Sequence, residues 1–221
     1  MNPSESMLHE LVCIPASLLS PSEDVYFCLM SSAFCTLEDF TITPKNCMDD
    51  IFHEIVKYAP SGYNKDGIYT SDDWTSISDI GKSFNGKILS VKDYLKVEEQ
   101  YVNTVLMIMS ALDCEYLAIE YIEINQDKMA NDIEIYRKKY GVSITGTLPK
   151  LKKGTRLSRI NAPNVLRLCL RELCYIVFSC KSKELELYFS YDYYLNVKCP
   201  IDRNTLSQIV KKNNLYLDPR G

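Results

Sequence analysis

The chain has 221 residues, of which 46% are hydrophobic and 24% charged, and its formal net charge is −4. This size and composition predict a single globular domain over residues 1–221, with an extended arm at residues 1–22. Eight glycines and nine prolines are too few for a low-complexity or disordered chain. The acidic balance lacks the basic footprint of a nucleic-acid-binding domain, so we expect a protein partner and no nucleic acid.

The cysteines and histidines argue against a metal site. The nine cysteines form no Cys-x-x-Cys pair, and several lie in apolar runs, as is typical of buried thiols in a reducing cytosol. A zinc site needs closely spaced Cys and His pairs, and only two histidines are present, His9 and His53. We therefore predict no metal and no cofactor.

No segment has the character of a membrane span or a secretory signal. The longest apolar run, residues 105–112, has eight residues, whereas a helix needs ~20 to span a bilayer. No basic stretch precedes an apolar core near the N-terminus. The sequence therefore predicts a cytoplasmic protein without membrane contact.

The first predicted elements are apolar segments separated by turn residues. Residues 25–30 (VYFCLM) suit a buried strand, and residues 34–42 continue the sheet. A helix is expected over residues 46–58 because apolar residues recur there at helical spacing: Met48, Ile51, Ile55 and Tyr58. Residues 63–85 then form a polar, turn-rich loop that holds the only tryptophan, Trp74.

Two helices in the middle of the chain carry clear start and stop signals. The first is expected over residues 90–112, because Ser90 can cap its N-terminus. The second is expected over residues 125–140, because Gly141 can adopt the left-handed conformation that ends a helix. Between them, residues 116–124 (YLAIEYIEI) predict a strand.

The C-terminal part predicts a hairpin followed by a last helix. Residues 164–180 suit a helix in their first half and a strand in their second. Residues 184–198 (ELELYFSYDYYLNVK) are apolar at every odd position, which gives one buried and one solvent-facing side. Fully extended they would span roughly 45 Å, so we expect a bend, a bulge or two strands, with the break at Ser190. Residues 202–212 predict a helix.

Together these elements predict an α+β fold, in which a mainly antiparallel sheet with a C-terminal β-hairpin is packed by three or four helices. The chain has no glycine-rich phosphate loop, nucleophile elbow or His-Glu-x-x-His helix. A Cys–His nucleophile would have to be assembled by the fold around His9 or His53. We therefore predict that the protein is not an enzyme.

Two acidic and aromatic segments are candidates for partner contact. Asp72 and Asp73 precede Trp74 in the long loop, and tryptophan is enriched at interface hot spots, although it can equally pin a loop to the core. Asp192 and Tyr194 belong to the densest aromatic cluster, Tyr-Asp-Tyr-Tyr, where tyrosines give rigid contact area and a carboxylate complements a basic target. We take these five as partner-binding residues.

Three alternatives remain open. Asp192 can instead form a hydrogen bond with a neighbouring Arg or Tyr at the centre of the sheet, and the candidate arginines are Arg167 and Arg171. Clustered carboxylates can hold Mg²⁺ for chemistry on nucleotides or nucleic acid, and the candidate set is Glu172, Glu184, Glu186 and Asp192. The third alternative is an adaptor or structural subunit.

The run LELYFSYDYYLNV, followed by a Pro-led helix and the tail NNLYLDP, resembles the end of many small bacterial immunity proteins. In those proteins a strand of the form F-G-Y-D-Y-Y-M-Y precedes a last helix and a G-L-F-like tail, and an L-R-E segment similar to LRLCLREL comes before it. The likeness covers roughly the last quarter of the chain. It departs from the family pattern at Ser190, where glycine is common, and at Asn196, where an aromatic is common.

This resemblance implies an immunity protein of a polymorphic toxin system, of the contact-dependent inhibition, Rhs or type VI effector kind. Such a protein binds one cognate toxin domain in a tight stoichiometric complex and blocks the active site or the activation of that toxin.

Overall fold

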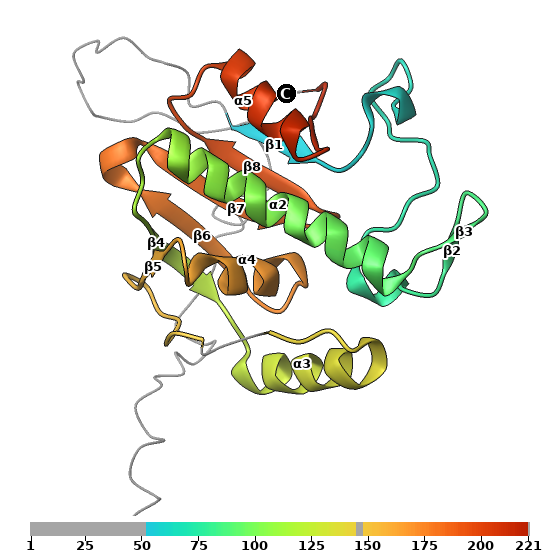
Figure 1. Cartoon of the computed structure of the whole chain (residues 1–221), viewed down its shortest axis with the longest axis horizontal. Helices are drawn as coiled ribbons and strands as arrows, with labels where there is room; N and C mark the ends of the chain where they lie inside the picture. The colour runs from blue at the N-terminus through green and yellow to red at the C-terminus, as the bar shows by residue number, and fades with distance from the viewer. Residues whose placement is uncertain (1–51, 145–147, 221) are drawn as a thin grey trace, which may run out of the picture. The chain divides into compact units, whose positions relative to one another are not determined.

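The structure is a computed structural model that describes residues 52–144 and 148–220, all within one compact unit, Met48–Gly221 (Figure 1). The expected arm and the elements expected before residue 52 lie outside the described residues, so the single domain over residues 1–221 stays a prediction. Within the described ranges, no helix combines the length and the apolar character that crossing a membrane requires.

Seven antiparallel strands form one sheet in the order β5-β4-β6-β7-β8-β1-β9 (Figure 1). Their bounds are β1 His53–Val56, β4 Tyr116–Glu123, β5 Arg156–Ser158, β6 Tyr175–Cys180, β7 Leu185–Ser190, β8 Tyr194–Lys198 and β9 Tyr216–Leu217. Strand β7 is the fourth of the seven, so the C-terminal hairpin lies at the centre of the sheet. A separate hairpin pairs β2 (Ser83–Phe84) with β3 (Lys87–Ile88). These findings confirm the predicted α+β fold.

Local sequence signals account for the helices, which are α2 (Val91–Ala111), α3 (Gln126–Tyr140), α4 (Ala162–Leu170) and α5 (Arg203–Lys212). The Ser90 hydroxyl caps α2 by accepting a hydrogen bond from the backbone N–H of Asp93. Gly141 ends α3 with a φ of 68°, which is the left-handed conformation expected of it. The predicted helices over residues 90–112, 125–140 and 202–212 are confirmed. Three short 3₁₀ turns complete the elements: η1 (Pro60–Gly62), η2 (Ile77–Asp79) and η3 (Lys181–Lys183).

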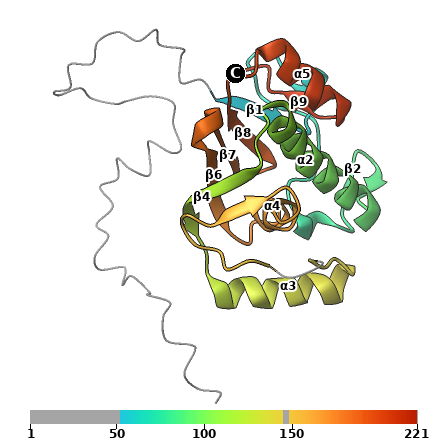
Figure 2. The ribbon, with the colours of Figure 1, turned by 60° about the vertical axis from the view of Figure 1, so that its left-hand side comes forward.

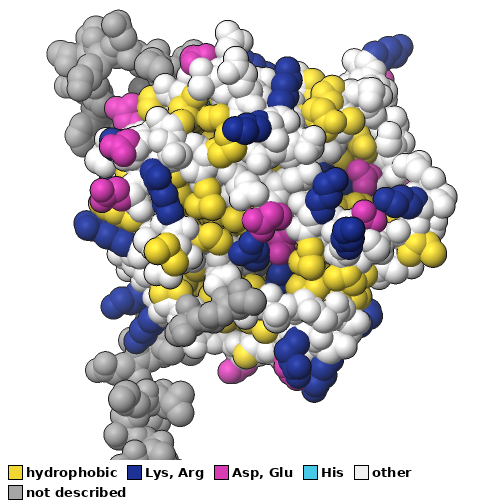
Figure 3. Space-filling model, in the orientation of Figure 1, with side chains coloured by type: hydrophobic (Ala, Val, Ile, Leu, Met, Phe, Trp, Pro, Cys, Tyr) yellow, Lys and Arg dark blue, Asp and Glu magenta, His cyan; other side chains and the backbone are white. Residues whose placement is uncertain are grey.

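Helices α2, α4 and α5 lie on one side of the sheet, and α3 lies beyond α4 (Figures 1 and 2). The odd-numbered residues of β7 and β8 face these helices and are buried: Leu185, Leu187, Phe189, Leu195 and Val197. Basic, acidic and hydrophobic side chains alternate over the outer surface of the helices (Figure 3). We call the opposite side of the sheet the far face, and no helix of the described residues covers it (Figure 2).

The prediction of a helix over residues 46–58 is wrong for residues 52–58, which the structure describes. Residues 53–56 form β1, which pairs with β8 on one side and with β9 on the other. Ile55 is buried against the helices, whereas Val56 is buried outside that core. A strand at this place satisfies the backbone groups along the edge of β8, which a helix would leave unpaired. Tertiary pairing therefore overrides the short helical spacing.

A buried ion pair joins α2 to the residue that caps the end of α4. The Arg171 guanidinium donates two hydrogen bonds of 2.7 Å, from Nε and Nη2, to the Glu98 carboxylate. The two residues are 4% and 1% exposed, and this bidentate geometry is the strong form of a carboxylate–guanidinium contact. Arg167 contacts Glu98 and the neighbouring Glu99. The pairing of Asp192 with Arg167 or Arg171 is therefore wrong, because both arginines bind glutamates of α2.

The substitution Glu98→Gln should lower the free energy of unfolding by about 3 kcal/mol, because it leaves the Arg171 charge buried without its counter-charge. Urea unfolding followed by circular dichroism measures this loss. Glu134→Gln serves as the control, because Glu134 pairs with Arg137 and Lys138 on the exposed surface of α3. Equal midpoints for the two variants would contradict the structural role of the buried pair.

Candidate functional site: an acidic and aromatic turn cluster

The β7–β8 connection is a tight turn at Tyr191–Tyr193, in which two successive residues have left-handed backbone conformations. Asp192 has a φ of 58° and Tyr193 a φ of 62°, and the Tyr194 N–H donates a hydrogen bond of 3.3 Å to the Tyr191 carbonyl. Positive φ at both central residues normally selects Asn-Gly or Asp-Gly. A tyrosine in this conformation is strained, and contacts elsewhere in the fold must hold it.

Burial of the Tyr193 ring holds the turn in place. Its centroid lies 5.1 Å from that of Trp74, 5.6 Å from that of Tyr101 and 6.2 Å from that of Tyr94. Two hydroxyl groups also fix the turn backbone, since Tyr58 donates to the Asp192 carbonyl at 2.7 Å and Tyr101 donates to the Tyr193 carbonyl. With Tyr193 turned inward, Tyr191 points outward and is 68% exposed.

Beside this turn, Lys57 is buried between two aromatic rings. Its Nζ lies 4.2 Å from the Trp74 ring centroid and 4.3 Å from that of Tyr58. The ammonium forms an ion pair with Asp73 at 2.9 Å, but the contact lacks the angle of a hydrogen bond. Burial lowers the pKa of Lys57, and Asp73 opposes that shift. Cation–π attraction and the ion pair therefore tie the loop before η2 to the end of β1.

Further carboxylates surround the turn. The negative charges of Asp79 and Asp192 also oppose the lowering of the Lys57 pKa. Desolvation, followed by the charges of Asp192 and Asp79, raises the pKa of Glu172. Although burial opposes the ionisation of Asp79, hydrogen bonds from Lys82 and from two backbone N–H groups lower its pKa. We call Asp73, Asp79, Glu172, Asp192 and Tyr191 the turn cluster.

The structure brings three of the five predicted partner-binding residues together and separates the other two. Asp73, Trp74 and Asp192 meet around Lys57. Asp72 instead accepts hydrogen bonds from Asn85 in the β2–β3 hairpin. Tyr194 lies on the far face, where its hydroxyl accepts a hydrogen bond of 3.0 Å from Arg220. Trp74 is 8% exposed, so its geometry is that of a residue that pins the loop to the core.

Sequence reasoning missed three members of this region: Lys57, Asp79 and Tyr191. Asp79 had a readable signal, since it closes a capping box with Ser76. Tyr191 belongs to the aromatic cluster that the sequence analysis singled out, but the strict alternation assigns its side chain to the buried side of the sheet. The expected break exists but lies after Ser190, and the three-residue turn leaves Tyr193 buried while it exposes Tyr191.

The proposed Mg²⁺-binding carboxylates do not assemble. Glu172 lies near Asp192, but Glu184 precedes β7 at its opposite end, and Glu186 of β7 pairs with Lys198 of β8. Among residues 52–144 and 148–220, no three His, Cys, Asp or Glu side chains form a group that could hold a metal ion.

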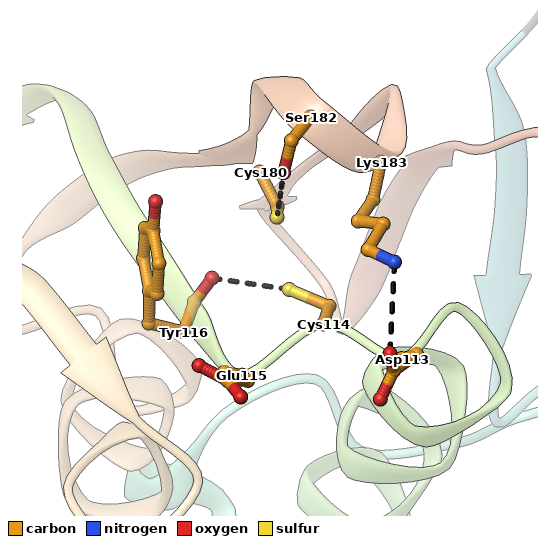
Figure 4. A pocket seen from close by; sticks show the side chains of 7 residues that line it. All are labelled: Asp113, Cys114, Glu115, Tyr116, Cys180, Ser182 and Lys183. Atoms are coloured by element: carbon orange, nitrogen blue, oxygen red, sulfur yellow. Dashed lines mark hydrogen bonds and ion pairs between the residues drawn. The ribbon is translucent and has the colours of Figure 1, made fainter.

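A hollow of about 240 Å³ lies between the start of β4 and η3 (Figure 4). Its lining includes the thiols of Cys114 and Cys180. The Cys114 Sγ donates a hydrogen bond of 3.0 Å to the Tyr116 carbonyl. Burial, together with the neighbouring Cys180, raises the pKa of Cys114 to about 12. This thiol is therefore protonated at neutral pH, and the lining contains no histidine that would activate it.

Comparisons with known protein families, with curated proteins and with solved structures found no match for this chain.

The strain of the turn can be measured at Asp192. Asp192→Ala and Asp192→Gly both remove the carboxylate and both keep the backbone carbonyl that Tyr58 binds. The glycine variant should be more stable by about 1 kcal/mol, because only glycine adopts a positive φ without a steric penalty. Chemical unfolding of the two variants gives the difference, and equal stability would contradict the left-handed turn.

A double-mutant cycle tests the ion pair of Lys57. Asp73→Asn should cost about 2 kcal/mol, a value reduced for the partial exposure of Asp73, since the ammonium loses its counter-charge. Lys57→Met in the Asp73→Asn background should restore most of that loss, because the ammonium is then absent. Trp74 is the only tryptophan, so its fluorescence reports unfolding of this region directly. Additive effects of the two substitutions would show that the charges are not coupled.

Proposed function

We propose that this chain is an immunity protein that binds a cognate bacterial toxin domain through the turn cluster and blocks it by contact. The observation that carries the proposal is Tyr191, which is 68% exposed on a turn that is held in place by the buried side chain of Tyr193, two residues further along. Because the turn backbone is fixed, it loses little conformational freedom on binding, which is how preorganised segments contribute affinity.

The surroundings of Tyr191 favour a basic partner. Asp192 and Glu172 are exposed beside it, and carboxylates at the rim of an interface steer a positively charged partner and raise the association rate. The resemblance of the hairpin and the last helix to bacterial immunity proteins supports the same class of partner. The protonated Cys114 thiol and the scattered carboxylates favour an inhibitor over an enzyme.

The test begins with a search for a neighbouring reading frame that ends in a toxin domain, and that domain is then used as the partner. Co-expression of the full chain should rescue cells from the toxin, and the two proteins should co-purify as a stoichiometric complex. Tyr191→Ser should weaken the complex by about 2 kcal/mol or more, as expected for a central aromatic contact. Isothermal titration calorimetry measures this loss.

Ile160→Ser is the matched control, because Ile160 is 86% exposed and lies between β5 and α4, outside the turn cluster. Its affinity for the toxin domain should equal that of the native chain. Failure of the native chain to rescue cells would refute the immunity function. Rescue by the native chain with full affinity in Tyr191→Ser would refute the turn cluster as the binding surface.

A further inference from the structure

The loop that follows β1 is ordered although it buries nothing, and we call its residues 59–70 the Ile68 loop. It projects beyond the end of β1 (Figure 1). The structure describes all of residues 59–70, and none of them is buried. Fixing the backbone of one residue costs about 1–2 kcal/mol of conformational entropy, and burial of the loop's own side chains offsets little of that cost. Compact surface loops of this kind are frequently functional.

Hydrogen bonds within the Ile68 loop close it into a small hairpin. At its base, the Thr70 N–H donates a hydrogen bond of 2.9 Å to the Gly62 carbonyl. At its tip, the side-chain oxygen of Asn64 accepts hydrogen bonds from the backbone N–H groups of Asp66 and Ile68, at 3.0 and 2.9 Å. An asparagine that binds the backbone ahead of it stabilises a turn. The tip therefore has a fixed conformation before any partner binds.

Aromatic packing and Arg220 attach the Ile68 loop to the rest of the molecule. The ring centroids of Tyr63 and Tyr69 are 5.1 Å apart, and the Tyr63 hydroxyl donates a hydrogen bond of 3.0 Å to the buried carboxylate of Asp218. The Arg220 guanidinium also binds Asp218, and it lies 5.4 Å from the Tyr63 ring centroid. A Cβ at Gly62 would lie 2.3 Å from the Tyr69 ring, so this close packing requires glycine.

The Ile68 loop adjoins the turn cluster through its second tyrosine. The Tyr69 ring centroid lies 4.7 Å from that of Tyr58, and the Tyr58 hydroxyl binds the Asp192 carbonyl. Desolvation, followed by the charge of Asp73, raises the pKa of Tyr69, so Tyr69 lies near a second member of the turn cluster. Ile68 directly precedes Tyr69 and is 60% exposed. An exposed apolar side chain on a fixed loop therefore lies next to the acidic surface.

We propose that the Ile68 loop is a second contact element for the toxin domain, and that Ile68 fills an apolar depression beside the basic surface that the turn cluster attracts. This inference rests on the proposed function, because one partner occupies both elements. A single exposed isoleucine is common on protein surfaces, but this one is held on a fixed loop that is continuous with the candidate site. Lys65 and Asp66 at the tip carry opposite charges, so the loop supplies apolar contact and the turn cluster supplies the charge. An apolar contact with charged groups around it is the usual anatomy of an interface.

Calorimetry of the full chain with the toxin domain from the neighbouring reading frame tests the contact. Ile68→Ser should weaken binding about tenfold, because the apolar side chain that the partner covers is lost. Ile68→Val keeps most of that side chain and should bind within about twofold of the native chain. Ile160→Ser is again the control and should bind as the native chain does, because Ile160 lies outside both contact elements.

Hydrogen exchange of the full chain alone tests the fixed conformation of the loop without a partner. The backbone N–H groups of Ile68 and Thr70 should exchange about tenfold more slowly than in an unstructured peptide, because both have acceptors within the loop. Gly62→Ala should abolish this protection and weaken toxin binding about threefold, although Ile68 is still present. Exchange of the native loop at the rate of an unstructured peptide would overturn the proposal.

The outcomes separate this inference from the proposed function. If the native chain binds the toxin domain and Tyr191→Ser weakens the complex, but Ile68→Ser binds as the native chain does, the Ile68 loop is not a contact element and the proposed function stands. If the native chain does not bind the toxin domain, both proposals fail. Dimers of the native chain in sedimentation that disappear in Ile68→Ser, with unchanged affinity for the toxin domain, would overturn the inference in favour of self-association.

Discussion

The inward rotation of Tyr193 is the constraint on which the candidate site depends. Its backbone adopts a conformation that a tyrosine avoids in isolation, and the packing of its ring against Trp74, Tyr94 and Tyr101 compensates for that strain. Because Tyr193 points into the core, Asp192 forms the tip of the turn and Tyr191 faces solvent. The same ring anchors Trp74, and through Trp74 the long loop that carries Asp73. One buried side chain thus positions residues from two distant parts of the chain.

The buried Glu98–Arg171 pair lies next to this aromatic stack, and the two support each other. The charge of Glu98 raises the pKa of Tyr94 and Tyr193, and the charge of Arg171 opposes the rise at Tyr94. The pair fixes the first half of α2 against the end of α4 through two well-formed hydrogen bonds. Glu172, which directly follows Arg171, is held at the rim of the turn cluster in this way. A rigid scaffold of helix and sheet therefore carries a surface made of loops and turns, the usual arrangement at binding sites.

The two sides of the sheet have different chemistry. The side under α2, α4 and α5 is aliphatic and aromatic and is closed, whereas the far face carries tyrosines among both carboxylates and cations. The hollow between β4 and η3 contains the Cys114 thiol, which donates a hydrogen bond to a backbone carbonyl and has a raised pKa. Rigid rings supply contact area and carboxylates attract positively charged groups, so the turn cluster fits the binding function that we propose.

The sequence by itself determined the features that local forces control. Caps and glycines set the ends of α2, α3 and α5, and strict alternation set the buried side of β7 and β8. Only the tertiary structure decided the rest, because contacts between distant residues control it. Strand pairing on both sides made residues 53–56 a strand. Arg171 pairs with Glu98 of α2 and not with Asp192. Burial of Tyr193 under Trp74 turned Tyr191 outward. The period-two pattern of the sequence could not predict this, because residues outside the hairpin stabilise the turn.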